Sequence, residues 1–169
     1  RRQRQMCIRD RYYTETNNRR AMLELNLPRY AYKLKRDGDS VSIFDPLRRK
    51  YVTLTPEEWV RQHFVSFLIS CKGYPAGRMG NEISLVVNRQ KRRCDTIVYD
   101  GRGEPMAIVE YKAPQVAITQ SVFDQIVRYN MVLKVKYLIV SNGLRHYACR
   151  INYTDNSYEF LKDIPSYEE

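Results

Sequence analysis

The clearest hydrophobic pattern along the chain is that of an amphipathic helix over residues 55–73. Its apolar residues recur at helical spacing and share one face: Val60, Phe64, Phe67 and Leu68. Thr55 is a suitable N-cap, Pro56 fits the first helical position, and Glu58 stands where a capping box has its acid. The pattern predicts a helix that begins after Thr55 and ends near Gly73.

Short apolar runs separated by turn residues predict the strands of a sheet. Three of them follow the helix directly, at residues 81–90, 92–100 and 106–112. A second amphipathic helix is expected at residues 118–133, with these residues on its buried side: Phe123, Ile126, Val127 and Leu133. The apolar run at 135–143 is typical of a strand buried on both faces. The chain then turns at "YTDNS", so a final hairpin is expected from residues 145–152 and 157–165.

The order of these elements is helix, three strands, helix, strand and hairpin. We therefore expect an α/β (α+β) fold with helices packed on a mixed sheet and an extra C-terminal β-hairpin. Before the first helix, "RDGDS" is a hairpin signal and "FDPLRRK" is typical of a loop. Residues 22–54 are thus predicted to form a β-hairpin region and residues 55–165 the core, followed by a tail at 166–169.

Residues 1–21 are expected to lie outside the fold. The first eleven, "RRQRQMCIRDR", resemble the in-frame translation of a transposon-end adapter used in DNA sequencing libraries, which would make Met22 the start of the protein. The alternative is a genuine basic tail that binds nucleic acid or is simply solvated. Residues 1–11 hold five arginines and one aspartate, so without them the formal net charge falls from +10 to +6. That charge still permits a nucleic-acid partner.

The composition suits one globular domain, with 169 residues of which 43% are hydrophobic and 28% charged. No run of 18 apolar residues and no secretory signal pattern is present, so we expect a cytoplasmic protein without a membrane span. Cys71, Cys94 and Cys149 are far apart, which favours free thiols over a zinc ribbon or an iron–sulfur cluster. The isolated His63 and His146 are expected to be ordinary surface or half-buried residues.

Charged residues interrupt two otherwise apolar strands of the predicted sheet. If the turn "DGRGEP" is symmetric, Asp95 lies directly opposite Glu110, and Lys112 shares their face. Two facing carboxylates repel each other unless they ionise unevenly, are solvated or take up a cation. A Mg²⁺ ion held by Asp95, Glu110 and the backbone carbonyl of Tyr111 would remove the repulsion. Lys112 would then orient a water molecule or stabilise charge on a phosphate.

Two interpretations of these charges remain open. In the first, the metal site hydrolyses a phosphodiester bond. In the second, the residues lie solvated or ion-paired on the exposed face of an edge hairpin. The apolar character of both strands on both faces, with residues such as Ile97 and Val109, is typical of central strands and supports the first interpretation.

The first helix offers a third carboxylate. Glu57 lies about 60° from Val60 on a helical wheel, at the flank of the buried stripe, whereas Glu58 lies about 160° away and is expected on the solvent side. Glu57 is therefore the better candidate to point at the sheet, and Arg61, one turn beyond, would reach a phosphate. The alternative for Glu57 is a simple interaction with the helix dipole.

The second helix carries Gln125 and Tyr129, which are four residues apart and so share a face. They lie at the edge of its apolar stripe, a placement that suits side chains reaching into a cleft to order a site or contact a substrate. The alternative is a partly exposed pair without a function.

In their order along the chain, the charged and polar residues of these elements resemble the PD-(D/E)xK nuclease superfamily, in the branch with a Q-x-x-x-Y helix: Glu57, Asp95, Glu110, Tyr111, Lys112, Gln125 and Tyr129. More narrowly, "LNLPRYAYKLK", "TPEEWVRQ", "RCDTIVYD", "IVEYKAP" and "FDQIVRYN" resemble small proteins related to the N-terminal nuclease domain of type I restriction enzyme R subunits. The resemblance runs from about Leu25 to Pro165. One departure is Cys94, which stands where the motif has its proline.

The resemblance implies a restriction-endonuclease-like core and a Mg²⁺-dependent (endo)deoxyribonuclease, with Mn²⁺ as a possible substitute and DNA as the partner. It implies that Asp95 and Glu110 bind the metal, that Lys112 serves the attacking water, and that Glu57 assists. Gln125 and Tyr129 would support the site. A non-catalytic nucleic-acid-binding or assembly module on the same fold is the alternative, and a structural domain without a nucleic-acid partner is a third possibility.

Overall fold

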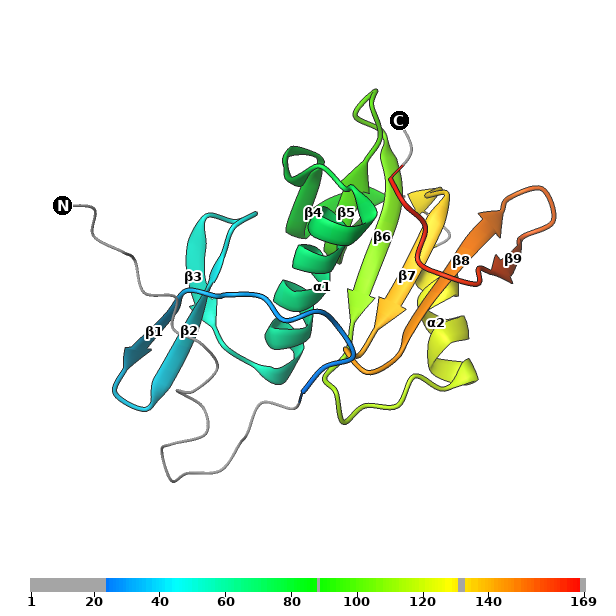
Figure 1. The fold of residues 1–169 in the computed structure, drawn as a ribbon. Coiled ribbons are helices and arrows are strands. Elements are labelled where there is room, and N and C mark those ends of the chain that lie inside the picture. The colour runs from blue at the N-terminus through cyan, green and yellow to red at the C-terminus, as the bar shows by residue number, and fades with distance from the viewer. Residues whose placement is uncertain (1–23, 88, 131–132, 168–169) are drawn as a thin grey trace.

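The computed structural model describes residues 24–87, 89–130 and 133–167, so the expected leader at residues 1–21 and Met22 lie outside the described residues. The described chain forms two sheets, one of three strands in the order β1-β2-β3 and one of six in the order β4-β5-β6-β7-β8-β9 (Figure 1). In this view the helix α1 lies in front of the large sheet, and the small sheet stands to the left of α1.

The small sheet precedes the first helix. Its strands are antiparallel neighbours: β1 (Leu34–Asp37), β2 (Ser40–Asp45) and β3 (Lys50–Thr53). The predicted turn "RDGDS" joins the first two strands, where Gly38 has φ +57°, and the predicted loop joins the second and third. The expected hairpin is thus present, and a third strand extends it.

The first helix, α1 (Pro56–Lys72), begins and ends as its sequence predicts. The side chain of Thr55 accepts a hydrogen bond from the backbone N–H of Glu58 at 3.0 Å, which satisfies one of the orphan donors of the first turn. Gly73 takes the left-handed conformation at φ 75°, and the N–H of Tyr74 donates to the carbonyl of Leu68 at 3.1 Å. A short 3-10 turn, η2 (Ala76–Arg78), leads into the large sheet.

The large sheet is mixed, as expected. Its strands are β4 (Met79–Val87), β5 (Gln90–Tyr99), β6 (Pro105–Tyr111), β7 (Tyr137–Ser141), β8 (His146–Asn152) and β9 (Ser157–Phe160). Neighbours are antiparallel except β6 and β7, which are parallel and are connected through α2 (Gln120–Asn130). The predicted order of helix, three strands, helix, strand and hairpin is therefore confirmed, with ends that differ by a few residues.

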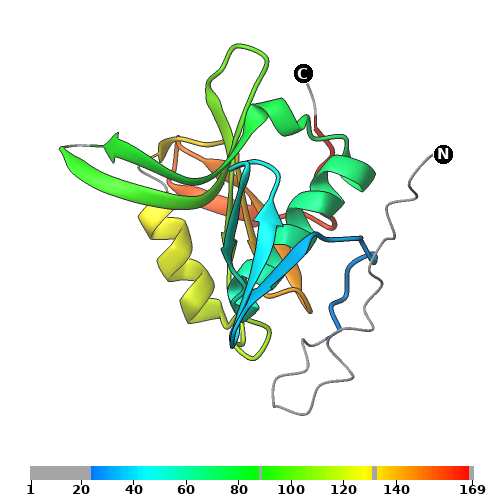
Figure 2. The ribbon, with the colours of Figure 1, turned by 90° about the vertical axis from the view of Figure 1, so that its left-hand side faces the viewer.

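The two helices cover opposite faces of this sheet, so the core has three layers (Figure 2). On one face, α1 packs Val60, Phe64 and Leu68 against residues such as Val109, all of them fully buried. On the other face, α2 contributes buried side chains to a second cluster: Phe123, Ile126 and Val127. Burying one such side chain contributes about 1.5–3 kcal/mol, so both helices are held mainly by their apolar stripes.

The pairing of β5 with β6 follows the register expected for a symmetric turn. Thr96 lies opposite Val109, and Val98 lies opposite Ala107. The register shifts only next to the turn, where Tyr99 pairs with Pro105. The irregularity is therefore at the turn end of the hairpin, and the predicted register holds as far as Thr96 and Val109, the last pair before the charged residues.

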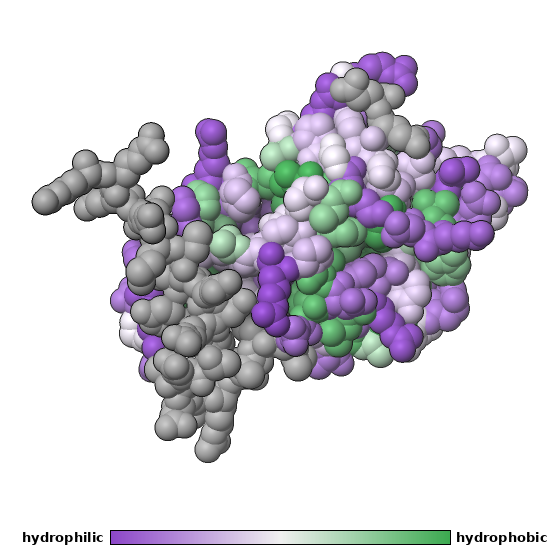
Figure 3. Space-filling view, in the orientation of Figure 1, coloured by the Kyte–Doolittle hydropathy of each residue, from purple (hydrophilic) through white to green (hydrophobic). Residues whose placement is uncertain are grey.

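The outer surface is mixed in character. Figure 3 shows apolar residues gathered toward the middle of the face that α1 covers, with hydrophilic residues at its rim. Within residues 24–87, 89–130 and 133–167, no helix has the length and apolar character needed to cross a membrane.

Candidate active site

The candidate site lies where β6 ends beside β5. The regular pairing of β5 with β6 ends at Thr96 and Val109, so Asp95 and Glu110 follow directly beyond the last pair of the ladder. The backbone N–H of Tyr111 donates to the Oδ2 atom of Asp95 at 2.9 Å. This hydrogen bond fixes the carboxylate of one strand against the backbone of the strand that carries Glu110 and Lys112.

On its other side, β5 departs from regular pairing with β4. Asn81 pairs with Thr96 and Ile83 pairs with Cys94, but Glu82, which stands between them, has φ +57° and no partner in the ladder. Cys94 and Ile97, three residues apart, are buried in the same cluster on the α2 side, so the usual alternation of side chains is broken between them. Such a distortion re-aims the side chain at its centre, which here is Asp95.

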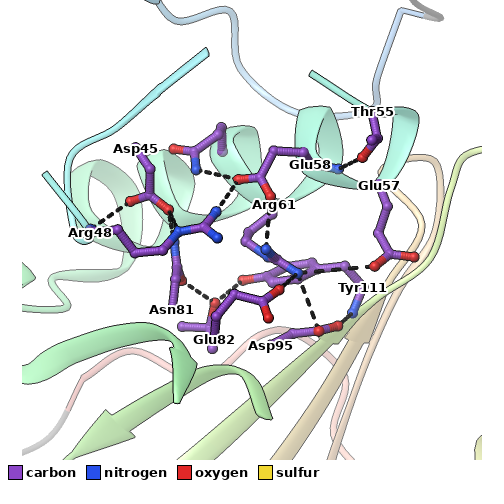
Figure 4. Close-up of polar contacts among 12 residues, drawn as sticks. Asp45, Arg48, Thr55, Glu57, Glu58, Arg61, Asn81, Glu82, Asp95 and Tyr111 are labelled. Atoms are coloured by element: carbon purple, nitrogen blue, oxygen red, sulfur yellow. Dashed lines mark hydrogen bonds and ion pairs between the residues drawn. The ribbon is translucent and has the colours of Figure 1, made fainter. Parts of the chain in front are cut away.

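The re-aimed carboxylate of Asp95 meets a buried arginine of α1. Arg61, whose side chain is 4% exposed, lies 3.2 Å from Asp95 Oδ1, 2.6 Å from Glu82 Oε1 and 2.8 Å from Glu58 Oε2. A fourth carboxylate, that of Glu57, lies 4.0 Å away. Figure 4 shows these acids turned toward the one guanidinium group. Arg61 was expected to reach a phosphate, and the structure places its charged group among carboxylates instead.

Glu58 corrects one expectation from the helical wheel. It was expected on the solvent side, yet it is 7% exposed. Its side chain accepts hydrogen bonds from Arg48 at 2.7 Å, from Arg61 at 2.8 Å and from Gln62 at 2.8 Å. The reason is tertiary: the loop between β2 and β3 brings Arg48 over the first turn of α1 and covers a flank that the helix alone would leave in water.

Glu57 lies at the edge of the site, with its side chain 44% exposed. Partial burial raises the pKa of its carboxyl, and the negative charge of Asp95 raises this pKa further, while Arg61 and Lys112 lower it. Asp95 and Lys112 therefore act on Glu57 through space, which agrees with the expectation that Glu57 points at the sheet. Its part in a reaction stays a prediction.

The triplet that follows Val109 divides between the faces of the sheet. Tyr111 is fully buried in the cluster under α1, and its hydroxyl donates to Thr96 Oγ1 at 3.0 Å. Glu110 precedes it on the opposite face, that of Ile108. Burial first, and then the negative charges of Glu110 and Asp95, together raise the pKa of the Cys94 thiol to about 12. Both carboxylates thus act on the same thiol.

Gln125 and Tyr129 belong to α2, as expected, but their side chains lie outside the described part of the structure. Their supporting role stays a prediction.

Glu82 was missed by the sequence interpretation. A glutamate at the head of the apolar run "ISLVV" is the same kind of signal that drew attention to Asp95, so it could have been recognised. The polar chain that braces the site was also missed. In it, Asn81 Nδ2 donates a hydrogen bond to Asp45 Oδ2 at 2.8 Å, and Thr96 Oγ1 donates one to Asn81 Oδ1 at 2.6 Å. These residues come from three separate elements, and no local pattern connects them.

The donor set fits a hard divalent cation. Among the described residues, no group of three His, Cys, Asp or Glu side chains is placed to hold an ion. Mg²⁺ does not require such a group, because one or two carboxylates with retained waters commonly suffice. Asp95 and Glu110 offer oxygen ligands of that kind. The carboxylate of Asp95 turns toward α1, however, while Glu110 lies on the face of Ile108, so their meeting at one ion stays a prediction.

Fold and site together define an α/β domain whose mixed sheet carries acids and a lysine at the end of one hairpin. Residues 56–165 match the model of the family described as type I restriction enzyme R protein N terminus (HSDR_N), and the chain belongs to this family. The expected relationship to R-subunit N-terminal domains is thereby confirmed.

Other comparisons add little to this assignment. None of the curated proteins compared with the chain matches it. Among solved structures, a fragment described as a candidate HsdR subunit of a type I restriction enzyme from Vibrio vulnificus YJ016 is 20% identical, with a TM-score of 0.49. The match covers 67% of this chain and 24% of that one, so the chain spans about a quarter of the length of that protein.

Proposed function

We propose that this chain is a metal-dependent nuclease domain that hydrolyses phosphodiester bonds of DNA, a Mg²⁺-dependent endodeoxyribonuclease of the PD-(D/E)xK type. The observation that supports it best is the 2.9 Å hydrogen bond from Tyr111 N–H to Asp95 Oδ2. It holds an acid of β5 against the end of β6, beside Glu110 and Lys112. Membership of the R-protein N-terminal family supports DNA as the partner.

In this proposal each residue has a stated role. Asp95, Glu110 and the carbonyl of Tyr111 would hold Mg²⁺, or Mn²⁺ in its place, and the bound ion would supply a Lewis acid for the phosphate. Lys112 donates a hydrogen bond to the attacking water or to a phosphate oxygen and stabilises developing negative charge. Glu57 assists as a proton acceptor, since a raised pKa brings a carboxylate closer to the pH at which general bases are effective. Gln125 and Tyr129 would support the site from α2.

Arg61 acts through Asp95 and is therefore a positioning residue. Its guanidinium and the Tyr111 N–H hold the two oxygens of Asp95, at 3.2 Å and 2.9 Å. The same observation favours the alternative function, a non-catalytic nucleic-acid-binding module, because both carboxylate oxygens are already engaged by the chain itself. The two functions differ in whether the protein cuts.

A cleavage assay separates them. The purified protein is incubated with supercoiled, linear duplex and single-stranded DNA in Mg²⁺, Mn²⁺ or EDTA. We expect metal-dependent cutting that Glu110→Gln and Lys112→Ala each reduce by about 100-fold or more. The matched control is Glu104→Gln, an exposed acid in the turn of the same hairpin, which should cut like the wild type.

Two results would count against the proposal. A folded wild-type protein that binds DNA but cuts none of the three forms with either metal supports the non-catalytic module. Cutting that survives both Glu110→Gln and Lys112→Ala would place the reaction elsewhere in the chain.

A further inference from the structure

One segment of the large sheet extends beyond the strands that make up the core. Pairing of β5 with β6 ends at Thr96, whereas its pairing with β4 continues out to Val87 opposite Gln90. Residues 84–87 and 89–93, here called the arm, therefore form a two-stranded ribbon past the end of β6. Figure 2 shows this ribbon reaching out from the body of the molecule on the side of α2.

The arm is basic. Its described side chains include the exposed Arg89, Lys91 and Arg93. No acidic residue occurs between Glu82 and Asp95 in the sequence. Arg93 pairs with Glu82 at the base of the arm, whereas Arg89 and Lys91 lie exposed farther out, where two like charges on a narrow ribbon suit a polyanionic partner.

The arrangement of the arm is as informative as its charge. Val86 pairs with Lys91 and Ser84 pairs with Arg93, so these four residues share one face of the ribbon. Val86 is 75% exposed, the most exposed of the large hydrophobic residues in the described chain. An apolar side chain flanked by cations suits a surface that has phosphates at its edges and base or sugar carbons between them.

We propose that the arm lies in the major groove of double-stranded DNA while the candidate active site faces the adjacent backbone. The major groove of B-form DNA, about 12 Å wide, admits a two-stranded β-ribbon. The major groove of an RNA duplex is too deep and narrow for this, and a single strand has no groove. The inference rests on the proposed function and deepens it, since it names the element that binds the DNA and the groove that this element enters.

Ion pairs connect the arm to the site. Arg93 pairs with Glu82, whose other oxygen lies 2.6 Å from Arg61, and Arg61 lies 3.2 Å from Asp95. The base of the arm is thus fixed to the carboxylate that the reaction would use. A duplex held by the arm would therefore pass beside Asp95, and the arm would not have to move relative to the rest of the sheet.

The test measures binding without cleavage. Fluorescence anisotropy in EDTA compares a labelled DNA duplex of about 20 base pairs, one strand of it alone, and an RNA duplex of the same sequence. The arm variant is Arg89→Ala/Lys91→Ala. Its matched control is Lys35→Ala/Arg36→Ala, which removes the same charge from exposed positions of β1 in the small sheet. Arg93 is left intact because it pairs with Glu82.

We expect the wild type to bind the DNA duplex more tightly than the single strand or the RNA. The arm variant should lose about tenfold in duplex affinity, and the slope of log affinity against log salt should fall by about two. The control variant should lose less than about threefold. Equal losses in the arm and control variants, or an arm variant that weakens single-strand and duplex binding alike, would overturn the inference.

The outcome is distinguishable from that of the cleavage assay. A wild type that binds duplex DNA through the arm but never cuts leaves the arm assignment in place and removes the nuclease. A wild type that cuts, together with an arm variant that binds and cuts equally well, leaves the nuclease in place and removes the arm. An absence of duplex binding by the wild type overturns the arm assignment directly.

Discussion

Arg61 is the residue on which the electrostatics of the site depend. Its side chain is 4% exposed and serves carboxylates from α1, β4 and β5. A buried charge of this kind is tolerated only when its partners compensate for lost hydration. Here the carboxylates compensate for the buried guanidinium, and the guanidinium compensates for the carboxylates. The same carboxylates would otherwise repel one another across the gap between helix and sheet.

We predict that Arg61→Met lowers the free energy of unfolding by about 3 kcal/mol, because it leaves the half-buried Asp95 without its cation and leaves Glu58 and Glu82 with Arg48 and Arg93 alone. Urea unfolding monitored by circular dichroism measures the change. The control is Arg102→Met: Arg102 is 89% exposed and lies 3.6 Å from Asp100, so its loss should cost well under about 1 kcal/mol. A loss below about 1 kcal/mol for Arg61→Met would contradict the role given to this arginine.

Glu57 provides a prediction with a pH dependence. Its pKa is raised in the folded protein, mainly by burial and then by Asp95, so the folded state binds more protons than the unfolded chain. The ionised Glu57 therefore reduces stability as the pH rises from its ordinary pKa through the raised one. Glu57→Gln should be at least as stable as the wild type at about pH 7.5, and this advantage should shrink at about pH 4.

Urea unfolding at both pH values tests this, with the exposed Glu104→Gln as the control. The gain will be small, because the side chain of Glu57 is 44% exposed and solvent screens it. The same variant should cut DNA more slowly than the wild type in the cleavage assay, since the proposed proton acceptor is gone. A Glu57→Gln protein that is clearly less stable at neutral pH would refute the assigned direction of the pKa shift.

At the scale of elements, local sequence predicted the parts well. The helix cap at Thr55 and the left-handed Gly73 follow from short-range rules, and the register that pairs Thr96 with Val109 follows from the length of one turn. The distortion at Glu82 does not follow from any of these. It depends on ion pairs of Glu82 with Arg61, which lies in α1, and with Arg93, which lies in the neighbouring strand β5.

That distortion changes what the hairpin can do. In a regular ladder, Asp95 would stand on the face opposite to Thr96, away from α1. Instead its carboxylate reaches Arg61 and the N–H of Tyr111. The strained backbone of Glu82, with φ +57°, thus accompanies the turn of Asp95 toward Arg61 of α1.

At the scale of the whole molecule, the described N-terminal segment, α1 and the β7–β8 turn meet at Gly143. The N–H of Asn26 donates to the Gly143 carbonyl at 2.8 Å. A Cβ atom at Gly143, which has φ +80°, would stand 2.6 Å from a methyl of Leu25 and 3.0 Å from one of Val60. This glycine is therefore required both by its backbone conformation and by the close packing of two other segments.

We predict that Gly143→Ala destabilises the protein more than Gly103→Ala does. Gly103 has φ +83°, but a Cβ atom there would have nothing within 4 Å, so its substitution should cost only backbone strain of about 1–2 kcal/mol. Gly143→Ala should lower the free energy of unfolding by a further ~1–3 kcal/mol, because its added methyl group overpacks the contact with Leu25 and Val60. Thermal and urea unfolding of both variants give the comparison, and equal losses would show that the contact with Leu25 is unimportant.

The sequence by itself determined the order and type of the elements, the mixed sheet and the register in which Thr96 pairs with Val109. It did so because hydrophobic period, caps and turn length act over a few neighbouring residues. Only the tertiary structure decided that Glu58 is buried, that Glu82 joins the site and that Arg61 faces carboxylates rather than solvent. These outcomes depend on charges from β4, β5 and the loop before β3 meeting α1, and the energy of such buried pairs is set by a desolvated environment that exists only once the chain has folded.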